Sequence, residues 1–139
     1  MTQGVADDPL DGNEHDHGNR ELVERFFAAS ERGDLAALET MVDEGMVMEW
    51  PQSGERFRGR ENVLGAMAAV EIKPQFAGVP RLTGSGPLWV LMVPLRYGEE
   101  VLQYVAILEL EGGRIRRATG YWGAPFPTQD SRAAFIDLT

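Results

Sequence analysis

The second half of the sequence alternates apolar stretches with short glycine-containing turns, and this pattern constrains the fold more than any other feature. Gly98-Glu99 and Gly112-Gly113 each separate two such stretches, and two-residue turns of this composition are typical of tight β-hairpins. Pro94 lacks the N–H that a central ladder needs, so a bulge or a strand end is expected there. An antiparallel meander is therefore predicted, with strands at residues 79–83, 88–97, 101–111 and 114–122.

The first half of the chain has helical periodicity instead. A helix is predicted from an N-cap at Asn19 to a stop at Gly33, and Asp34 caps a second helix. A short strand is expected at 46–50, and Gly59 opens a third helix. Helices combined with a meander indicate an α+β architecture, in which a curved antiparallel sheet wraps the helices.

Charge and length indicate one acidic domain. The chain has 139 residues and a formal net charge of −9, which is enough chain for one domain with its own core. Residues 1–18 contain five acids and neither Lys nor Arg, so they are predicted to form a disordered acidic tail. One domain is expected over 19–139, with a C-terminal extension at 123–139. The acidic balance argues against nucleic acid and membrane as partners.

The cysteine and histidine content narrows the chemistry. The chain has no cysteine, which excludes disulfides and thiolate ligands and suits a cytoplasmic protein. His15 and His17 lie in the predicted tail without a third ligand, so neither a metal nor a cofactor is expected. No secretory signal and no membrane-spanning segment are expected either.

Two motifs carry a resemblance to a known family. Residues 48–60 read MEWPQSGERFRGR, residues 120–127 read GYWGAPFP, and an Arg-Gly-Asp-Leu turn occupies 32–35. In this order and spacing, residues 19–127 resemble the SnoaL-like polyketide cyclase and ketosteroid isomerase group of the nuclear transport factor 2-like superfamily. The resemblance implies a cystatin-like α+β fold, in which a cone-shaped, curved antiparallel sheet wraps three N-terminal helices. It also implies a deep, largely apolar pocket inside the cone.

The same resemblance locates three catalytic positions of the ketosteroid isomerases. In those enzymes a helix tyrosine and a carboxylic acid on the sheet hold the oxyanion, and an aspartate before a proline moves the proton. The matching residues here are Phe26 for the tyrosine, Trp50 for the aspartate and Val105 for the acid. None of the three carries a proton at neutral pH, so steroid isomerisation by that mechanism is not expected.

Strand alternation predicts which side chains enter the cone. With the two glycine turns as loops, Met92 faces Val105, Gln103 faces Trp122 and Glu109 faces Arg116. If Val105 points inward, Gln103 and Arg96 are inward polar groups that could orient a ligand, although each of these side chains could instead be ordinary core or rim packing. The predicted ligand-binding residues are Phe26, Met48, Trp50, Met67, Val90, Met92, Arg96, Gln103, Val105 and Trp122.

The opposite face of the predicted sheet is also apolar. Left in water, such a face favours association, so a symmetric homodimer through the outer sheet face is expected. The residues assigned to this outer face are Trp89, Leu91, Val93, Leu95, Tyr97, Leu102, Tyr104, Ala106, Leu108, Leu110, Thr119 and Tyr121.

Two functional hypotheses follow. The first is a SnoaL-like protein that binds a small apolar ligand in the cone, with cyclase, isomerase or hydrolase-like catalysis left open. The second is a non-catalytic dimerising module whose cone is filled by its own side chains. An unfilled cone would favour the first hypothesis, and a cone packed solid by Phe26, Trp50 and Trp122 would favour the second.

Overall fold

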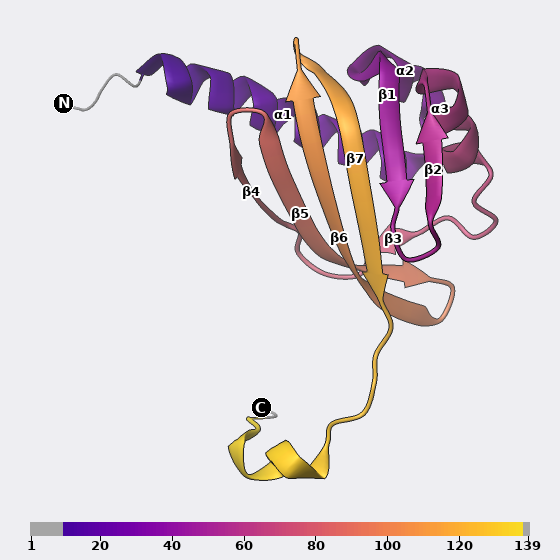
Figure 1. The fold of residues 1–139 in the computed structure, drawn as a ribbon, viewed down its shortest axis with the longest axis vertical. Helices are drawn as coiled ribbons and strands as arrows, with labels where there is room; N and C mark the ends of the chain where they lie inside the picture. The colour runs from indigo at the N-terminus through magenta and orange to yellow at the C-terminus, as the bar shows by residue number, and fades with distance from the viewer. Residues whose placement is uncertain (1–9, 138–139) are drawn as a thin grey trace.

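The computed structural model describes residues 10–137, with side chains from Asp16 onward. Figure 1 shows a long helix crossing one face of a curved sheet, with two short helices over one end of that sheet. The helices are α1 (Leu10–Arg32), α2 (Leu35–Met41), α3 (Arg60–Ala68) and a 3-10 helix, η1 (Asp130–Phe135). The strands are β1 (Val42–Trp50), β2 (Glu55–Arg58), β3 (Gln75–Phe76), β4 (Arg81–Ser85), β5 (Leu88–Tyr97), β6 (Glu100–Glu111) and β7 (Arg114–Gly123).

The sheet is mixed, which corrects the prediction of an antiparallel one. Its order is β2-β1-β7-β6-β5-β3, and β4 also pairs with β5. Strand β1 runs parallel to β7, while the other neighbours are antiparallel. The parallel pair arises because the final strand of the meander docks against a strand from the first half of the chain. The α+β cone fold is otherwise as predicted.

Local sequence signals set the helix boundaries. Gly33 adopts φ 72° directly after α1, a conformation that glycine reaches without strain. The Asp34 carboxylate accepts a hydrogen bond from the Ala37 N–H at 3.1 Å and caps α2. Gly59 precedes α3, as predicted. Within residues 10–137, no helix combines the length and the apolar character needed to cross a lipid bilayer.

The core lies between the helices and one face of the sheet, called here the inner face. Helix α3 packs on β1 and β2, and α1 packs on α2 and β4. Val23 from α1, Leu38 from α2 and Val63 from α3 are almost fully buried, in one core cluster with Met46 of β1 and Leu108 of β6. Strands β5 and β6 present every second residue to this core.

A β-bulge between β6 and β7 overturns the predicted orientation of β5 and β6. Leu110 lies opposite Ile115 but Glu109 lies opposite Arg117, so Arg116 is an extra residue in β7. Beyond the bulge the register is shifted by one, and Trp122 faces Tyr104 rather than Gln103. A one-residue slip exchanges the two faces of a strand. The turn at Gly112-Gly113 was placed correctly, but a bulge has no clear sequence signal.

The predicted outer face therefore belongs mostly to the core. Leu91 is 3% exposed and Leu108 is 1% exposed within a single chain, so their assignment to a dimer face is wrong. The face that is open in one chain carries the alternate residues of β5, β6 and β7. We call the apolar centre of this outer face the outer patch, and it consists of Val90, Met92, Val105, Ile107 and Tyr121.

Charged pairs border the outer patch. The Glu49 carboxylate accepts hydrogen bonds from Arg56 Nη2 at 2.8 Å and from Arg117. The hydrogen bond from Arg56 is the largest cause that lowers the pKa of Glu49, and Arg117 lowers it further. Arg117 also pairs with Glu109 at 3.8 Å. The predicted Glu109–Arg116 pair is thus wrong, because the bulge moves Arg117 opposite Glu109.

Pro94 sits inside β5 without breaking its ladder with β6. The β5–β6 register is continuous from Leu88 to Tyr97, so the predicted bulge or strand end is wrong. On the other edge of β5, β4 pairs as far as Met92 and β3 begins to pair at Leu95. Pro94 falls in the gap between those two partners, where its missing N–H leaves no ladder bond unmade.

The N-terminal helix begins earlier than predicted. Residues 10–18 form the first turns of α1 rather than a tail, so Asn19 is not an N-cap, while residues 1–9 lie outside the described residues. Asp16 accepts a hydrogen bond from the Gly86 N–H at 2.7 Å, and Asn19 donates to the Gly86 carbonyl at 2.8 Å. Two side chains of α1 thus hold the turn between β4 and β5.

Asp16→Ala is expected to lower the free energy of unfolding by about 0.5–1.5 kcal/mol, the usual net contribution of one hydrogen bond. Glu21→Ala is the matched control on the same helix, because the Glu21 side chain is 63% exposed and its partner, His17 at 3.9 Å, is exposed as well. Urea denaturation of both variants measures the difference. Equal stability of the two variants would contradict a structural role for the first turns of α1.

Candidate functional site

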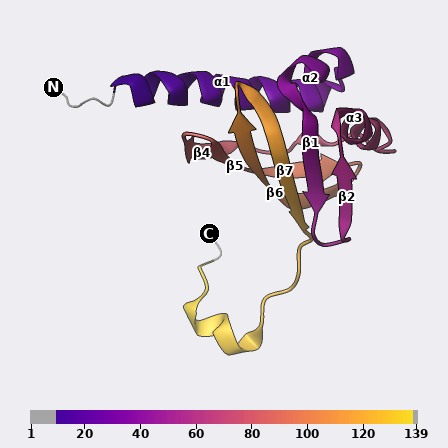
Figure 2. The same cartoon turned by 45° about the horizontal axis from the view of Figure 1, so that its top comes forward.

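A cavity of about 310 Å³ lies between the helices and the inner face of the sheet. Helix α1 contributes Phe26 and α3 contributes Met67 to its wall. The sheet contributes an aromatic wall, defined here as Trp50, Tyr97, Tyr104 and Trp122. Figure 2, turned from the first view, shows the same arrangement of α1, α2 and α3 relative to the sheet. An apolar hollow with a few polar groups is a usual small-molecule site.

Half of the predicted ligand-binding residues line this cavity, and they are Phe26, Met48, Trp50, Met67 and Trp122. The other five lie on the outer face or its edge, because the bulge reverses the parity on which they were chosen. The predicted inward orientation is therefore wrong for these five residues, which are Val90, Met92, Arg96, Gln103 and Val105. Whether a ligand touches the first five stays a prediction.

Sequence reasoning missed Tyr97 and Tyr104, the two hydroxyl groups of the aromatic wall. A signal for them was present in the composition of β5 and β6. The face chosen as inward contained Arg96, Gln103 and Glu109, whereas the alternate face contained no charged residue between Trp89 and Leu95. A buried inner face is expected to be the less polar of the two.

The aromatic wall is held together by ring contacts. The Trp50 and Trp122 rings meet edge to face with centroids 5.5 Å apart, and Trp50 meets Phe57 in the same way at 4.8 Å. Tyr104 lies 5.0 Å from Trp122 with an interplanar angle of 34°. Such pairs contribute about 0.5–1.5 kcal/mol beyond their burial, so the wall has a defined shape.

The O–H groups of Tyr97 and Tyr104 are available to donate hydrogen bonds. Trp122 Nε1 donates to the Tyr97 hydroxyl oxygen at 2.9 Å, which leaves the Tyr97 O–H without an acceptor among residues 10–137. The Tyr104 hydroxyl has no hydrogen-bond partner within the same described range. Burial raises the pKa of Tyr104 far above its ordinary value, and the nearby Tyr97 raises it slightly more. Burial also raises the pKa of Tyr97. Both hydroxyls therefore stay protonated at neutral pH.

On the side of β1, the last residues of β7 are fixed by a side chain, because the β1–β7 ladder ends at Thr119. Gln52 Nε2 donates to the Trp122 carbonyl at 2.6 Å, and the Trp122 N–H donates to Gln52 Oε1 at 2.6 Å. This two-way amide clamp ties the turn after β1 to the last residues of β7. It holds the Trp122 ring in the cavity wall.

Glu31 is the one carboxylate among the described residues that line the cavity. Its Oε2 accepts a hydrogen bond from the Phe76 N–H at 2.8 Å, so the carboxylate anchors β3. The Lys73 ammonium also lines the cavity. It packs so closely on Gly33 that a Cβ at position 33 would clash with Lys73 Nζ.

The three isomerase positions have different fates in the structure. Phe26 and Trp50 line the cavity, but Val105 lies on the outer face. The residue beside Trp122 in the cavity is Tyr104, which can donate a hydrogen bond. The hydrogen-bond donor Tyr104 is therefore present where the sheet acid was expected. Position 50 has a tryptophan, which cannot accept a proton.

A cone of this shape around an apolar cavity defines a protein of the nuclear transport factor 2-like class. A protein of this class and of unknown function from Burkholderia xenovorans LB400 has 29% sequence identity and a TM-score of 0.77, and the match covers 88% of this chain and 96% of that one. A protein from Kribbella flavida DSM 17836, described provisionally as a ketosteroid isomerase, has 25% identity and a TM-score of 0.83. That match covers 89% of this chain and 91% of the other.

The chain belongs to the SnoaL-like domain family, whose model matches residues 23–118. A protein from Xanthomonas campestris pv. campestris, described provisionally as a polyketide cyclase, shares the fold at 19% identity with a TM-score of 0.71; the match covers 78% of this chain and 93% of the other. No curated protein matches the chain.

Proposed function

We propose that this protein binds a small, largely apolar molecule that carries a hydrogen-bond-accepting oxygen, such as a cyclic ketone. The observation that carries the proposal is the cavity of about 310 Å³ with the hydroxyls of two partly buried tyrosines, Tyr97 and Tyr104, in its wall. A buried donor without an acceptor costs free energy, which a ligand oxygen recovers. The aromatic wall supplies flat apolar surfaces for the rest of the ligand.

The open cavity favours this function over a self-filled dimerising module. Phe26, Trp50 and Trp122 all reach the cavity, yet they leave space between the helices and the sheet. The provisional description of the Kribbella flavida protein as a ketosteroid isomerase agrees with a cyclic ketone as the ligand class. Catalysis stays open, because Glu31 is the sole described carboxylate in the wall and is engaged by a backbone N–H.

Loss of one tyrosine hydroxyl is expected to weaken the binding of a ketone selectively. The probes are 1-tetralone and tetralin, which share a bicyclic skeleton but differ in the carbonyl oxygen. One net hydrogen bond contributes about 0.5–1.5 kcal/mol, so Tyr104→Phe should weaken 1-tetralone binding by about 2- to 12-fold and leave tetralin binding unchanged. Trp50 and Trp122 line the cavity, so quenching of tryptophan fluorescence reports the binding of both probes.

Tyr121→Phe is the matched control, because this tyrosine lies on the outer face opposite Val105. It should leave the binding of both probes unchanged. Equal loss of 1-tetralone and tetralin binding in Tyr104→Phe would mean that the hydroxyl is structural. Absence of binding of either probe to the unmodified chain would argue against an open apolar site.

We further propose that the chain forms a homodimer through the outer face, in which Val90, Met92, Val105 and Ile107 replace the β5 and β6 residues first assigned to it and Tyr121 is retained. The patch residues are half-buried in one chain, and Tyr121 is 40% exposed. The charged residues Glu49, Arg117 and Glu109 lie along one side of the patch. An apolar centre with a polar rim is the usual anatomy of a protein interface.

A further inference from the structure

We propose that the C-terminal arm, residues 124–137, packs on the outer face of a second copy of this chain. The inference rests on the proposed dimer and adds to it an exchanged segment. Figures 1 and 2 both show the chain leaving β7 and carrying η1 away from the sheet and the helices. The arm is thus separated from the core of its own chain.

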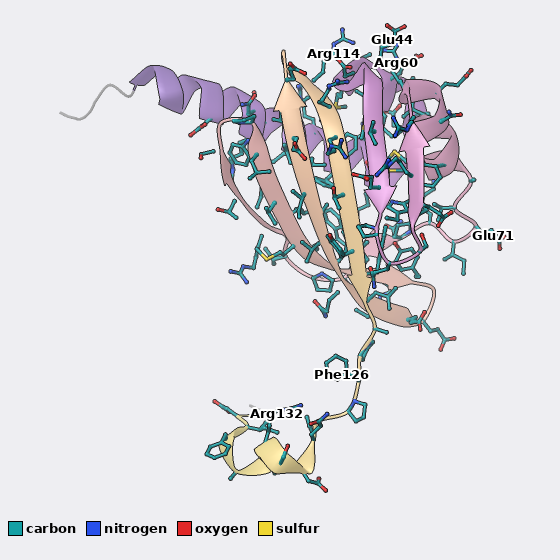
Figure 3. All side chains as sticks on the ribbon, viewed as in Figure 1. Glu44, Arg60, Glu71, Arg114, Phe126 and Arg132 are labelled. Atoms are coloured by element: carbon teal, nitrogen blue, oxygen red, sulfur yellow. The ribbon has the colours of Figure 1, made fainter. Side chains whose placement is uncertain are left out.

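The arm carries apolar side chains that its own chain leaves in water. Figure 3 labels Phe126 and Arg132 on this segment, well apart from the domain. Phe126 is 84% exposed and Phe135 is 87% exposed. Two phenyl rings in that state forgo the free energy that burial of an aromatic side chain provides. A surface that covers them would recover part of this free energy.

The ordered turn in the arm points to the same conclusion. Helix η1 is held by local hydrogen bonds, such as Arg132 N–H to the Gln129 carbonyl at 3.0 Å and Arg132 Nη1 to Gln129 Oε1 at 3.0 Å. An isolated helix of six residues is not stable in water by such bonds alone. Burial of its aromatic residues against another surface would supply the missing stability.

The root of the arm adjoins the outer patch. Tyr121 belongs to the patch and precedes the arm by three residues, and the Gln52 clamp on Trp122 fixes the point of departure. In a two-fold dimer centred on the patch, each arm therefore starts at the interface. Since the arm runs away from its own sheet, the partner is the surface that it meets. Both arms make the same contact, so the interface closes and leaves no free end.

Charge favours this occupant as well. The arm contains two acids, Asp130 and Asp137, and one base, Arg132. Arg81 lies opposite Met92 in the sheet and therefore shares the outer face with it, and the exposed Arg96 is on the same face. Neither arginine forms an ion pair with a residue in the described part of the chain. An acidic arm from the partner would lie against this basic edge.

Sedimentation velocity over a concentration series tests the contribution of the arm. The full chain is expected to dimerise. A chain that ends at Gly123 should have a dimer dissociation constant at least 10-fold higher. The double variant Phe126→Ala, Phe135→Ala should reproduce that loss without shortening the chain, while Ser131→Ala on the same turn should not. Circular dichroism would reveal a change of fold in the shortened chain. In that case the dissociation constant of the double variant decides whether the arm stabilises the dimer.

Photo-cross-linking identifies the surface that the arm touches. A benzoylphenylalanine at position 135 is placed in the full chain, and ¹⁴N- and ¹⁵N-labelled protein are mixed before irradiation. Peptides that join an arm of one label to β5, β6 or β7 of the other label are expected. Links confined to one label, or no links to these strands, would overturn the exchange of arms.

The outcomes separate this inference from the dimer on which it rests. If the dimer persists without the arm but Met92→Arg dissociates it, the outer-face dimer is supported and the exchange of arms is refuted. A full chain that stays monomeric at all concentrations would refute both. Ligand binding in the cavity is measured independently, with the tetralone probe on the same proteins.

Discussion

Leu108→Ala is expected to lower the free energy of unfolding by about 2–5 kcal/mol. Leu108 is 1% exposed on the inner face of β6 and also reaches the cavity wall. Removal of its side chain forfeits apolar burial and enlarges the hollow beneath it, and a core of this kind closes only in part. The loss is a large share of the stability of a single domain. Urea denaturation at several protein concentrations measures it.

Val101→Ala is the matched control on the same strand. Val101 lies opposite Arg96 on the outer face and is only partly buried, so its truncation should cost about 1 kcal/mol or less. The pair tests the parity of the sheet directly, because the predicted register without a bulge would reverse which side chain is buried. Equal losses, or a larger loss for Val101→Ala, would contradict the bulge between β6 and β7.

A Δ5-3-ketosteroid is expected to bind without turnover above background. An isomerase of that kind needs a base that moves a proton beside the carbonyl, and positioned acid–base groups contribute about 10²–10⁴-fold in rate. Trp50 occupies the position of that base, while Tyr104 provides a donor for the carbonyl oxygen. The donor alone binds a ketone but cannot remove its proton. Absorbance of the conjugated product measures the rate.

Steady turnover of the steroid would contradict this expectation and direct attention to Glu31. Its Oε2 is engaged by the Phe76 N–H at 2.8 Å, so a role in proton transfer requires β3 to move away from it. Glu31→Gln would then abolish turnover if the carboxylate is the base. The exposed Glu111 serves as the control position, since it lies at the hairpin end opposite Arg114.

Local sequence signals determined most of the secondary structure. Gly33, Asp34 and Gly59 act through the backbone within a few residues of themselves, and each marks the helix boundary predicted for it. The bounds of β5 were predicted correctly, as were the two glycine turns on either side of β6. Residues on elements with clear periodicity, such as Phe26 and Met67, were likewise assigned to the cavity wall correctly.

Only the tertiary structure decided which face of β5 and β6 encloses the cavity. The answer depends on one extra residue, Arg116, whose placement is set by how β7 meets both β6 and β1. Because side chains alternate along a strand, that single residue moves Tyr104 into the cavity and Val105 out of it. Turn chemistry and helix caps are local, so the chain alone specifies them. The face of a strand depends on packing between distant segments, and it is settled only when they meet.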